Sequence, residues 1–176
     1  MTNAPPPVNA APPDEGCGEF GIRIGRDGTW YYHNSPIGRL ALAKLFASVL
    51  RREADGSYWL VTPVERGRIV VDDVPFVAVE LDVAGDGRDQ ILSLRTNLDD
   101  RVEIGDGHEL RVEIDPATGE PRPYVMIRAG LEARLARSVF YHVVELGTEE
   151  VLDGHPQLGV WSKGQFFPLG DSTAAT

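Results

Sequence analysis

Apolar residues along this chain change their spacing several times, and each change marks a predicted element. Aromatic and β-branched residues on both sides of Gly25-Arg26-Asp27-Gly28 predict a hairpin over residues 20–33. Ser35-Pro36 then offers an N-cap residue followed by a first-turn proline, an arrangement that favours the start of a helix. Apolar residues recur at every fourth position from Ile37 to Val49, so we predict a helix from residue 36 to about residue 53.

Alternation of apolar and polar residues dominates the middle of the chain and predicts strands. These strands cover residues 58–62, 68–71, 75–83, 91–96, 101–104, 109–114 and 123–128. The turn Gly105-Asp106-Gly107-His108 predicts that 101–104 and 109–114 form a hairpin. A second helix is predicted from residue 131 to 146, because Leu131, Leu135 and Val139 lie four residues apart and Gly147 suits a helix end. Two short apolar segments, 158–161 and 165–168, complete the pattern.

The order of these elements is strands, helix, strands, helix and short strands, without the strict alternation of a parallel doubly wound sheet. We therefore predict an α+β fold with antiparallel sheets. Aligning Tyr31 with Tyr124 places Leu42 on Leu135, which suggests two similar subdomains with one long helix each. The predicted organisation is a disordered proline-rich tail (1–19), two α+β subdomains (20–84 and 85–170) and a disordered end (171–176).

Composition narrows the classes of function. The chain has 176 residues and a formal net charge of −10, which argues against general nucleic-acid binding because that binding relies on neutralising phosphates. No apolar run reaches the length of a membrane span, so no membrane span is expected. Residues 1–13 lack the features of a secretory signal, and we expect a cytoplasmic location. The single cysteine, Cys17, rules out an internal disulfide.

Few residues match a catalytic or cofactor motif. Gly16 to Gly21 spell G-x-G-x-x-G, but a proline-rich segment precedes them where a dinucleotide site requires a strand, so no cofactor is expected. The four histidines show no metal-ligand spacing. The paired acids Asp72-Asp73 and Asp99-Asp100 suit turns, and they also leave open a site for Mg²⁺ or Ca²⁺.

A set of cationic, aromatic and hydrogen-bonding residues suggests a binding site for an anionic small molecule. Arginine binds phosphate or carboxylate through two parallel hydrogen bonds, and aromatic faces stack on rings. The candidate ligand-binding residues are Arg95, Asn97, Tyr124, Arg128, Arg134, Trp161, Ser162 and Lys163. Arg134, Arg137 and Tyr141 also share a spacing of three and four residues. The alternative is that these arginines pair with the abundant acidic side chains.

Several long segments carry a family resemblance. They are residues 62–65, 71–76, 94–100 (Leu-Arg-Thr-Asn-Leu-Asp-Asp), 123–134 and 159–170 (Gly-Val-Trp-Ser-Lys-Gly-Gln-Phe-Phe-Pro-Leu-Gly). The chain resembles the bacterial family named domain of unknown function 1285 over about residues 20–170. The resemblance implies two duplicated α+β subdomains, the C-terminal one loosely like a pleckstrin-homology (PH) domain. It also implies a cleft for a nucleotide-like ligand between them and a role in signal transduction, and it carries over no catalytic residue.

Three functions remain open from the sequence. The first is a non-enzymatic protein that binds an anionic, nucleotide-like ligand between the subdomains. The second is an adaptor that docks a signalling protein through its PH-like half. The third is a metal-dependent hydrolase that uses Asp72, Asp73, Asp99 and Asp100.

Overall fold

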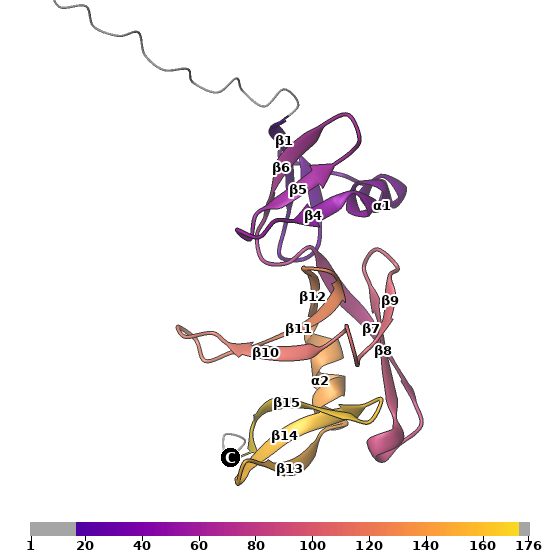
Figure 1. Cartoon of the computed structure of the whole chain (residues 1–176), viewed down its shortest axis with the longest axis vertical. Helices are drawn as coiled ribbons and strands as arrows, with labels where there is room; N and C mark the ends of the chain where they lie inside the picture. The colour runs from indigo at the N-terminus through magenta and orange to yellow at the C-terminus, as the bar shows by residue number, and fades with distance from the viewer. Residues whose placement is uncertain (1–16, 173–176) are drawn as a thin grey trace, which may run out of the picture.

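The computed structural model describes residues 17–172 and arranges them as fifteen β-strands and two α-helices in two stacked units (Figure 1). Most of both predicted tails, residues 1–16 and 173–176, lies outside the described residues. The tail prediction was wrong for Cys17–Glu19, which begin strand β1 (Cys17–Ile24). The α+β class is confirmed at this level, with far more sheet than helix.

A six-stranded sheet forms the N-terminal unit. Its order is β3-β2-β1-β6-β5-β4, with the central strands β1 and β6 parallel and the other neighbours antiparallel. The predicted hairpin is confirmed, because β1 pairs with β2 across the turn at residues 25–28. The other strands of this sheet are β2 (Trp30–Tyr32), β3 (Ser35–Pro36), β4 (Leu50–Arg52), β5 (Tyr58–Val61) and β6 (Arg66–Val71).

A second six-stranded sheet forms the body of the C-terminal unit. Its order is β10-β11-β12-β7-β8-β9, and β12 and β7 are its parallel pair. The strands are β7 (Phe76–Ala84), β8 (Ile91–Thr96), β9 (Arg101–Glu103), β10 (Leu110–Ile114), β11 (Pro121–Arg128) and β12 (Leu131–Leu135), with a short 3-10 helix η1 (Gly87–Asp89) before β8. The predicted hairpin between β9 and β10 was wrong. These strands lie at opposite edges of the sheet, and only a single bridge joins Gly105 to His108.

The two large sheets share one strand order. Numbered from the first strand of each unit, both have the order 3-2-1-6-5-4, and strands 1 and 6 are parallel in both. The helices break this correspondence, because α1 (Leu40–Ser48) lies between the third and fourth strands of its unit, whereas α2 (Arg137–Glu145) follows the sixth. The predicted alignment of Leu42 with Leu135 therefore fails, since Leu42 is helical and Leu135 lies in a strand. Duplication stays a prediction.

Both helices are shorter than predicted, nine residues each. Ser35-Pro36 form an edge strand rather than a helix start, and the residues after Val49 pair with β5. In the predicted second helix, the spacing of Leu131 and Leu135 fits both a helix and a strand, because residues four apart share a face in either structure. Burial between β7 and β11 selects the strand, and α2 begins at Arg137.

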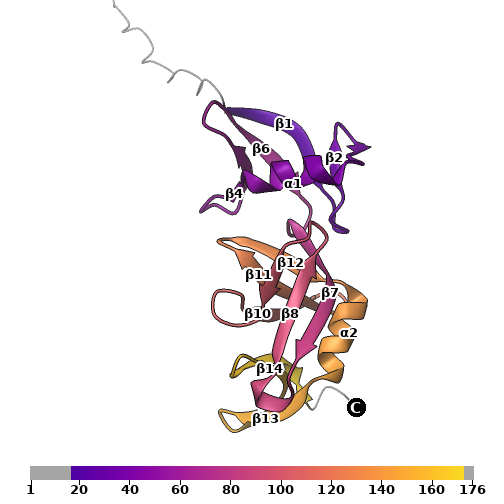
Figure 2. The same cartoon turned by 90° about the vertical axis from the view of Figure 1, so that its right-hand side faces the viewer.

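A three-stranded antiparallel sheet ends the chain. It contains β13 (Thr148–Leu152), β14 (His155–Ser162) and β15 (Gln165–Asp171), in that order. Figure 2 shows the two units end to end, with α2 beside β7 and the small sheet at the far end from α1. Neither helix among residues 17–172 has the length and apolar composition of a membrane span.

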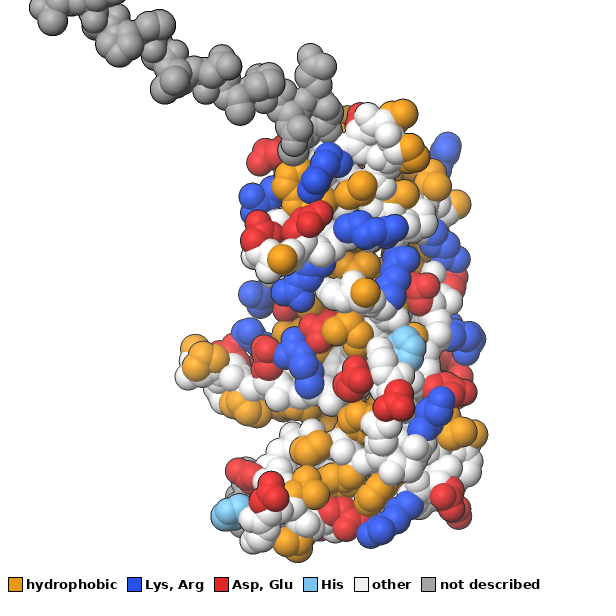
Figure 3. All heavy atoms as spheres, viewed as in Figure 1, with side chains coloured by type: hydrophobic (Ala, Val, Ile, Leu, Met, Phe, Trp, Pro, Cys, Tyr) orange, Lys and Arg blue, Asp and Glu red, His pale blue; other side chains and the backbone are white. Residues whose placement is uncertain are grey.

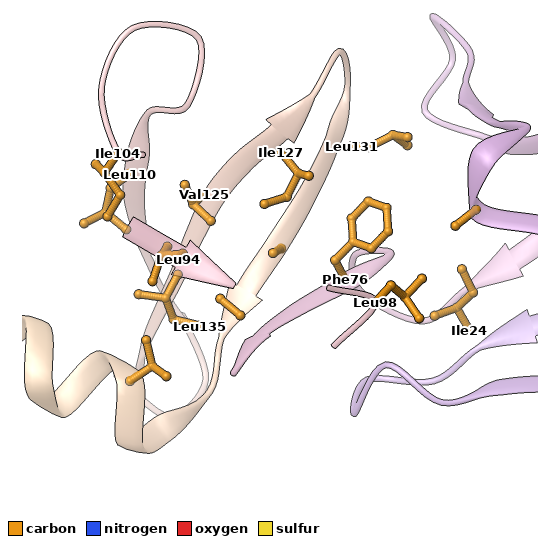
Figure 4. Packing of buried hydrophobic residues seen from close by; sticks show 14 of the residues in the cluster. Ile24, Phe76, Leu94, Leu98, Ile104, Leu110, Val125, Ile127, Leu131 and Leu135 are labelled. Atoms are coloured by element: carbon orange, nitrogen blue, oxygen red, sulfur yellow. The ribbon is translucent and has the colours of Figure 1, made fainter. Parts of the chain in front are cut away.

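One hydrophobic core runs through both units. Ile24 of the first sheet lies beside Phe76 and Leu98 of the second, and all three are almost fully buried (Figure 4). The units join through residues 72–75, immediately before β7. The subdomain boundary expected after residue 84 would assign β7 to the N-terminal unit, whereas β7 pairs only with β8 and β12 of the C-terminal sheet.

Candidate functional site

A cavity of about 430 Å³ lies at the junction of the two units. The turn between β1 and β2 contributes Arg26 and Asp27 from the N-terminal unit, and the end of β12 and the start of α2 contribute most of the opposite wall. This volume is within the range of small-molecule sites, and sites between domains are common. The junction cavity is therefore the candidate site.

Three arginines reach this cavity from three separate elements. Arg26 lies on the turn after β1, Arg134 on β12, and Arg137 is the first residue of α2. Within residues 17–172, neither Arg26 nor Arg137 pairs with a carboxylate, and only Arg134 does, with 3.6 Å between its Nη1 atom and Oδ2 of Asp73. The acids of the lining, Asp27 and Glu120, leave the wall with one net positive charge.

The start of α2 adds to the positive character. Ala136 is the N-cap residue and has no side chain that could accept hydrogen bonds from the first backbone N–H groups. Those groups carry the positive end of the helix dipole, where an arginine at the first position is unfavourable unless an anion is near. Phe140 and the exposed ring of Tyr141 lie one turn along the same wall. Guanidinium, N–H groups and aromatic rings together suit an anion that bears a ring.

The side chain of Asn97 connects two segments that form this cavity, through hydrogen bonds to their backbones. Its Oδ1 accepts a hydrogen bond from the backbone N–H of Val77 (3.0 Å), and its Nδ2 donates to the carbonyl of Gly28 (3.2 Å). Val77 lines the cavity, and Gly28 ends the turn that carries Arg26. Asn97 was predicted to contact a ligand, but its amide is already used to fix one unit to the other.

The acids of the connecting segment are fixed to different units. Asp72 pairs with Arg23 of β1 at 2.8 Å, whereas Asp73 accepts a hydrogen bond from the hydroxyl of Tyr124 at 2.9 Å. Burial, and then this bond to a carboxylate, raise the pKa of Tyr124 to about 12. Tyr124 is 2% exposed, so its ring is closed to a ligand. It supports Asp73, which in turn faces Arg134.

Two other predicted arginines lie away from the cavity. Arg95 donates to Glu80 (2.6 Å) and to Asp99 (3.1 Å), and these two carboxylates raise its pKa through hydrogen bonding, that of Glu80 first. Arg128 donates to the carbonyl of Ala47 in the last turn of α1. A cation is favourable at that end of a helix, so Arg128 caps α1 across the junction.

The segment Trp161-Ser162-Lys163 docks the small sheet onto the large one. The hydroxyl of Ser162, which is fully buried, donates to the carbonyl of Ile104 (2.7 Å) and accepts from the N–H of Leu92 (3.0 Å). Lys163 pairs with Glu103 of β9 (2.8 Å), whereas the indole N–H of Trp161 donates to Glu150 within the small sheet (3.2 Å). Of the eight predicted residues, the structure thus places only Arg134 in the cavity wall and Asn97 and Tyr124 behind it, and it does not bring the others there.

The four paired acids do not converge on one point. Asp99 pairs with Lys44 at 2.6 Å as well as with Arg95, and Asp72 and Asp73 point to different units. Residues 17–172 contain no group of three His, Cys, Asp or Glu side chains that could hold a metal ion. The geometry therefore gives no support to the metal-dependent hydrolase.

Sequence reasoning did not include Arg26 and Arg137 in the candidate set. The spacing of Arg134, Arg137 and Tyr141 had pointed to this region, but as one helix face rather than as a strand followed by a helix start. Arg26 occupies an exposed turn, and nothing local marks which surface that turn meets. Only the pairing of the two units brings it to α2.

Comparisons with known proteins agree on one family. The model described as "Domain of unknown function (DUF1285), N-terminal domain" matches residues 6–74, and "Protein of unknown function (DUF1285), C-terminal domain" matches residues 75–169. The two matches meet at the segment that joins the units. A search of curated proteins gave no match.

Two crystal structures of proteins described as DUF1285 family members are similar to this chain. The one from Silicibacter pomeroyi DSS-3 is 47% identical, with a TM-score of 0.82, and the match covers 99% of this chain and 92% of that one. The one from Shewanella baltica OS155 is 26% identical, with a TM-score of 0.55, and the match covers 71% of this chain and 91% of that one.

Proposed function

The chain belongs to the DUF1285 family, and from that premise we propose that it is a non-enzymatic protein which binds an anionic, nucleotide-like ligand in the junction cavity. Three arginines from three elements line this cavity, and two of them lack a carboxylate partner within residues 17–172. This observation supports the proposal most strongly. Among the described residues, seven of the twelve other arginines pair with acidic side chains, whereas these two guanidinium groups meet at one cavity without such a partner.

Each element has a distinct role in this proposal. Arg137 and the free N–H groups at the start of α2 bind the phosphate or carboxylate group, and Arg26 contacts it from the other unit. Tyr141, which is 57% exposed, offers its face to the ring. Arg134 is held by Asp73 and contributes charge.

A ligand in this position would contact both units at once. Ligand binding would therefore stabilise the arrangement in which the turn at Arg26 faces α2. In a signalling protein, this change in the arrangement of the units is the means by which ligand binding would act on a protein partner. Four predictions accompany this proposal. They are duplication of the subdomains, the PH-like character of the C-terminal half, a role in signal transduction and a cytoplasmic location.

Thermal unfolding in the presence of a nucleotide panel tests the proposal. A ligand present at a hundred times its Kd stabilises the folded state by about 2.7 kcal/mol, so the Tm should rise with at least one nucleotide. Arg137→Gln should abolish most of this rise. Arg101→Gln is the matched control, because Arg101 is an exposed arginine of the same unit outside the cavity, and it should leave the rise unchanged. The proposal would be wrong if the rise in Tm persisted in both variants, or if no nucleotide or phosphate raised the Tm of the wild-type chain.

An adaptor role is the second proposal, and one observation favours it. Strand β13 is an edge of the small sheet, and two of its apolar side chains are exposed, Val151 by 68% and Leu152 by 39%. An edge strand with apolar side chains can pair with a strand of a partner. Binding to a partner that Val151→Lys abolishes and Arg137→Gln retains would favour the adaptor over the ligand-binding protein.

A further inference from the structure

A groove of about 640 Å³ lies between α1 and the first sheet of the N-terminal unit. Phe20, Ile22 and Leu60 form its sheet wall, and Leu42 and Phe46 form its helix wall. The groove is open because a single nine-residue helix covers a six-stranded sheet. It shares no lining residue with the junction cavity, so whatever it binds is independent of the proposed function.

Two charged side chains, one basic and one acidic, line this groove. Arg39 lies in the segment between β3 and α1, and Glu65 lies just before β6. Arg39 is exposed and has no carboxylate partner within residues 17–172. The groove is therefore mostly apolar, and its one lining cation has no carboxylate partner in the described part of the chain.

The start of α1 reinforces the charge of Arg39. Arg39 is the N-cap residue, and no side chain caps the helix. The N–H groups of Leu42 and Ala43 donate to the Arg39 carbonyl, so those of Leu40 and Ala41 have no acceptor within the helix. A carboxylate at this end would meet one guanidinium and two backbone donors.

We propose that this groove binds an unbranched amphiphilic carboxylate, a fatty acid or a similar acyl chain, with its carboxylate at Arg39 and its methylene chain along Leu42, Phe46 and Phe20. The other lining residues are mostly apolar, and a methylene chain needs no hydrogen-bond partners among them. A peptide backbone would bring N–H and C=O groups that require partners.

Titration calorimetry with octanoate, decanoate and dodecanoate, each below its micelle concentration, tests the acyl-chain part on the wild-type chain. Each buried methylene should tighten binding about fourfold, the equivalent of ~0.8 kcal/mol, until the groove is filled. Dodecanol should bind more weakly than dodecanoate. No heat with any of the three acids, or an affinity that does not change with chain length, would overturn the proposal and point to a protein segment as the occupant.

Matched substitutions on α1 test the position. Leu42 lines the groove, whereas Leu45, one turn farther along and 62% exposed, does not. Leu42→Glu should weaken dodecanoate binding at least about tenfold by placing a charge at the apolar wall, and Leu45→Glu should change it less than about twofold. Equal effects of both substitutions would show binding to the exposed helix surface and contradict the groove.

The charge requirement has a separate test. Arg39→Gln should weaken dodecanoate about tenfold and leave dodecanol unchanged, because only the acid carries a charge. A parallel loss for the alcohol would contradict the role of Arg39. Should Leu42→Glu fail to fold by circular dichroism, this variant and the chain-length series still decide the proposal. Arg137→Gln should leave dodecanoate binding intact, which separates this groove from the junction cavity.

Discussion

The two units share a strand order and differ in what covers their sheets. The N-terminal sheet has one short helix across it and keeps an open apolar groove, with Tyr32, Leu40 and Leu45 each about half exposed or more. The C-terminal sheet has α2 and a further three-stranded sheet, and the side chain of Ser162 fastens that small sheet in place. One arrangement of strands can therefore support an open binding surface or a closed core, depending on the segments added around it.

The two units also differ in their balance of acidic and basic side chains. Residues 17–74 contain eight basic and seven acidic side chains, whereas residues 75–172 contain nine basic and eighteen acidic ones. In Figure 3, Lys and Arg side chains are conspicuous over the upper unit and the junction, and Asp and Glu side chains are frequent over the lower part. The C-terminal acids engage most arginines of that unit, so free guanidinium groups remain mainly at the junction and in the N-terminal unit.

Ser162→Ala is the sharpest test of the closed core, and we expect the largest effect from it. The change leaves the N–H of Leu92 and the carbonyl of Ile104 buried without a partner, which should cost about 3 kcal/mol of unfolding free energy. Denaturant unfolding measures it. Ser93→Ala is the control, since the Ser93 side chain makes no hydrogen bond in the described structure and should cost under about 0.5 kcal/mol. Equal losses would contradict the role of Ser162.

Gly28→Ala should uncouple the two units at the next largest cost. Gly28 has a φ of +82°, and an added Cβ would lie 2.5 Å from Nδ2 of Asn97. Backbone strain and the displaced Asn97 together should cost about 2–3 kcal/mol. Gly107, with a φ of +77° and no atom within 4 Å of such a Cβ, is the control, because its alanine variant reports the strain alone. Should the two alanine variants lose the same stability, the Asn97 contact contributes nothing.

The secondary structure shows which features of the fold could be predicted from the sequence. Strands β5 to β8 and β11 were predicted at nearly the right places, because alternation there reflects burial of one face. The second helix was predicted to end at the right place but to begin six residues too early, for a physical reason. The four-residue spacing of Leu131 and Leu135 fits a strand as well as a helix, and only the neighbours β7 and β11 decide between them.

The candidate site was harder to predict than the strands. Whether an arginine is free depends on which carboxylate lies beside it, and Arg95 meets Glu80 only through the pairing of β7 with β8. Arg26 and Arg137 are free because, among the described residues, no carboxylate forms an ion pair with either, although Asp27 and Glu120 line the same cavity. Residue type indicated the chemistry of an anion site, but its location depends on contacts between segments far apart in the sequence.

Tyr124→Phe should have an intermediate effect at the junction, about 1–2 kcal/mol. It removes the hydrogen bond that Asp73 accepts and leaves a largely buried carboxylate with Arg134 at 3.6 Å as its remaining charged contact. The raised pKa of Tyr124, about 12, means that the neutral phenol stabilises the fold below the ordinary tyrosine pKa near 10 and loses that contribution as the pH rises toward 12. The stability gap between wild type and variant should therefore be constant from pH 6 to 9. A gap that closes below pH 9 would contradict this assignment.

The ion pair between Lys44 of α1 and Asp99 of the C-terminal unit should have the smallest effect, because both side chains are more than 40% exposed and solvent screens them. The hydrogen bond from Lys44, more than the contact with Arg95, holds the pKa of Asp99 below its ordinary value. A lowered carboxyl pKa adds stability above the unfolded-state value near 3.9, and that stability is lost as the pH falls through the lower folded-state value. The Tm of Lys44→Gln should thus fall slightly below that of wild type at pH 7, and the two Tm values should converge toward pH 3.

High salt should also shrink the difference in Tm at pH 7, because screening weakens an exposed ion pair. A difference that persists at pH 3 or in high salt would mean that Lys44 joins the units through the packing of its methylene chain rather than through its charge.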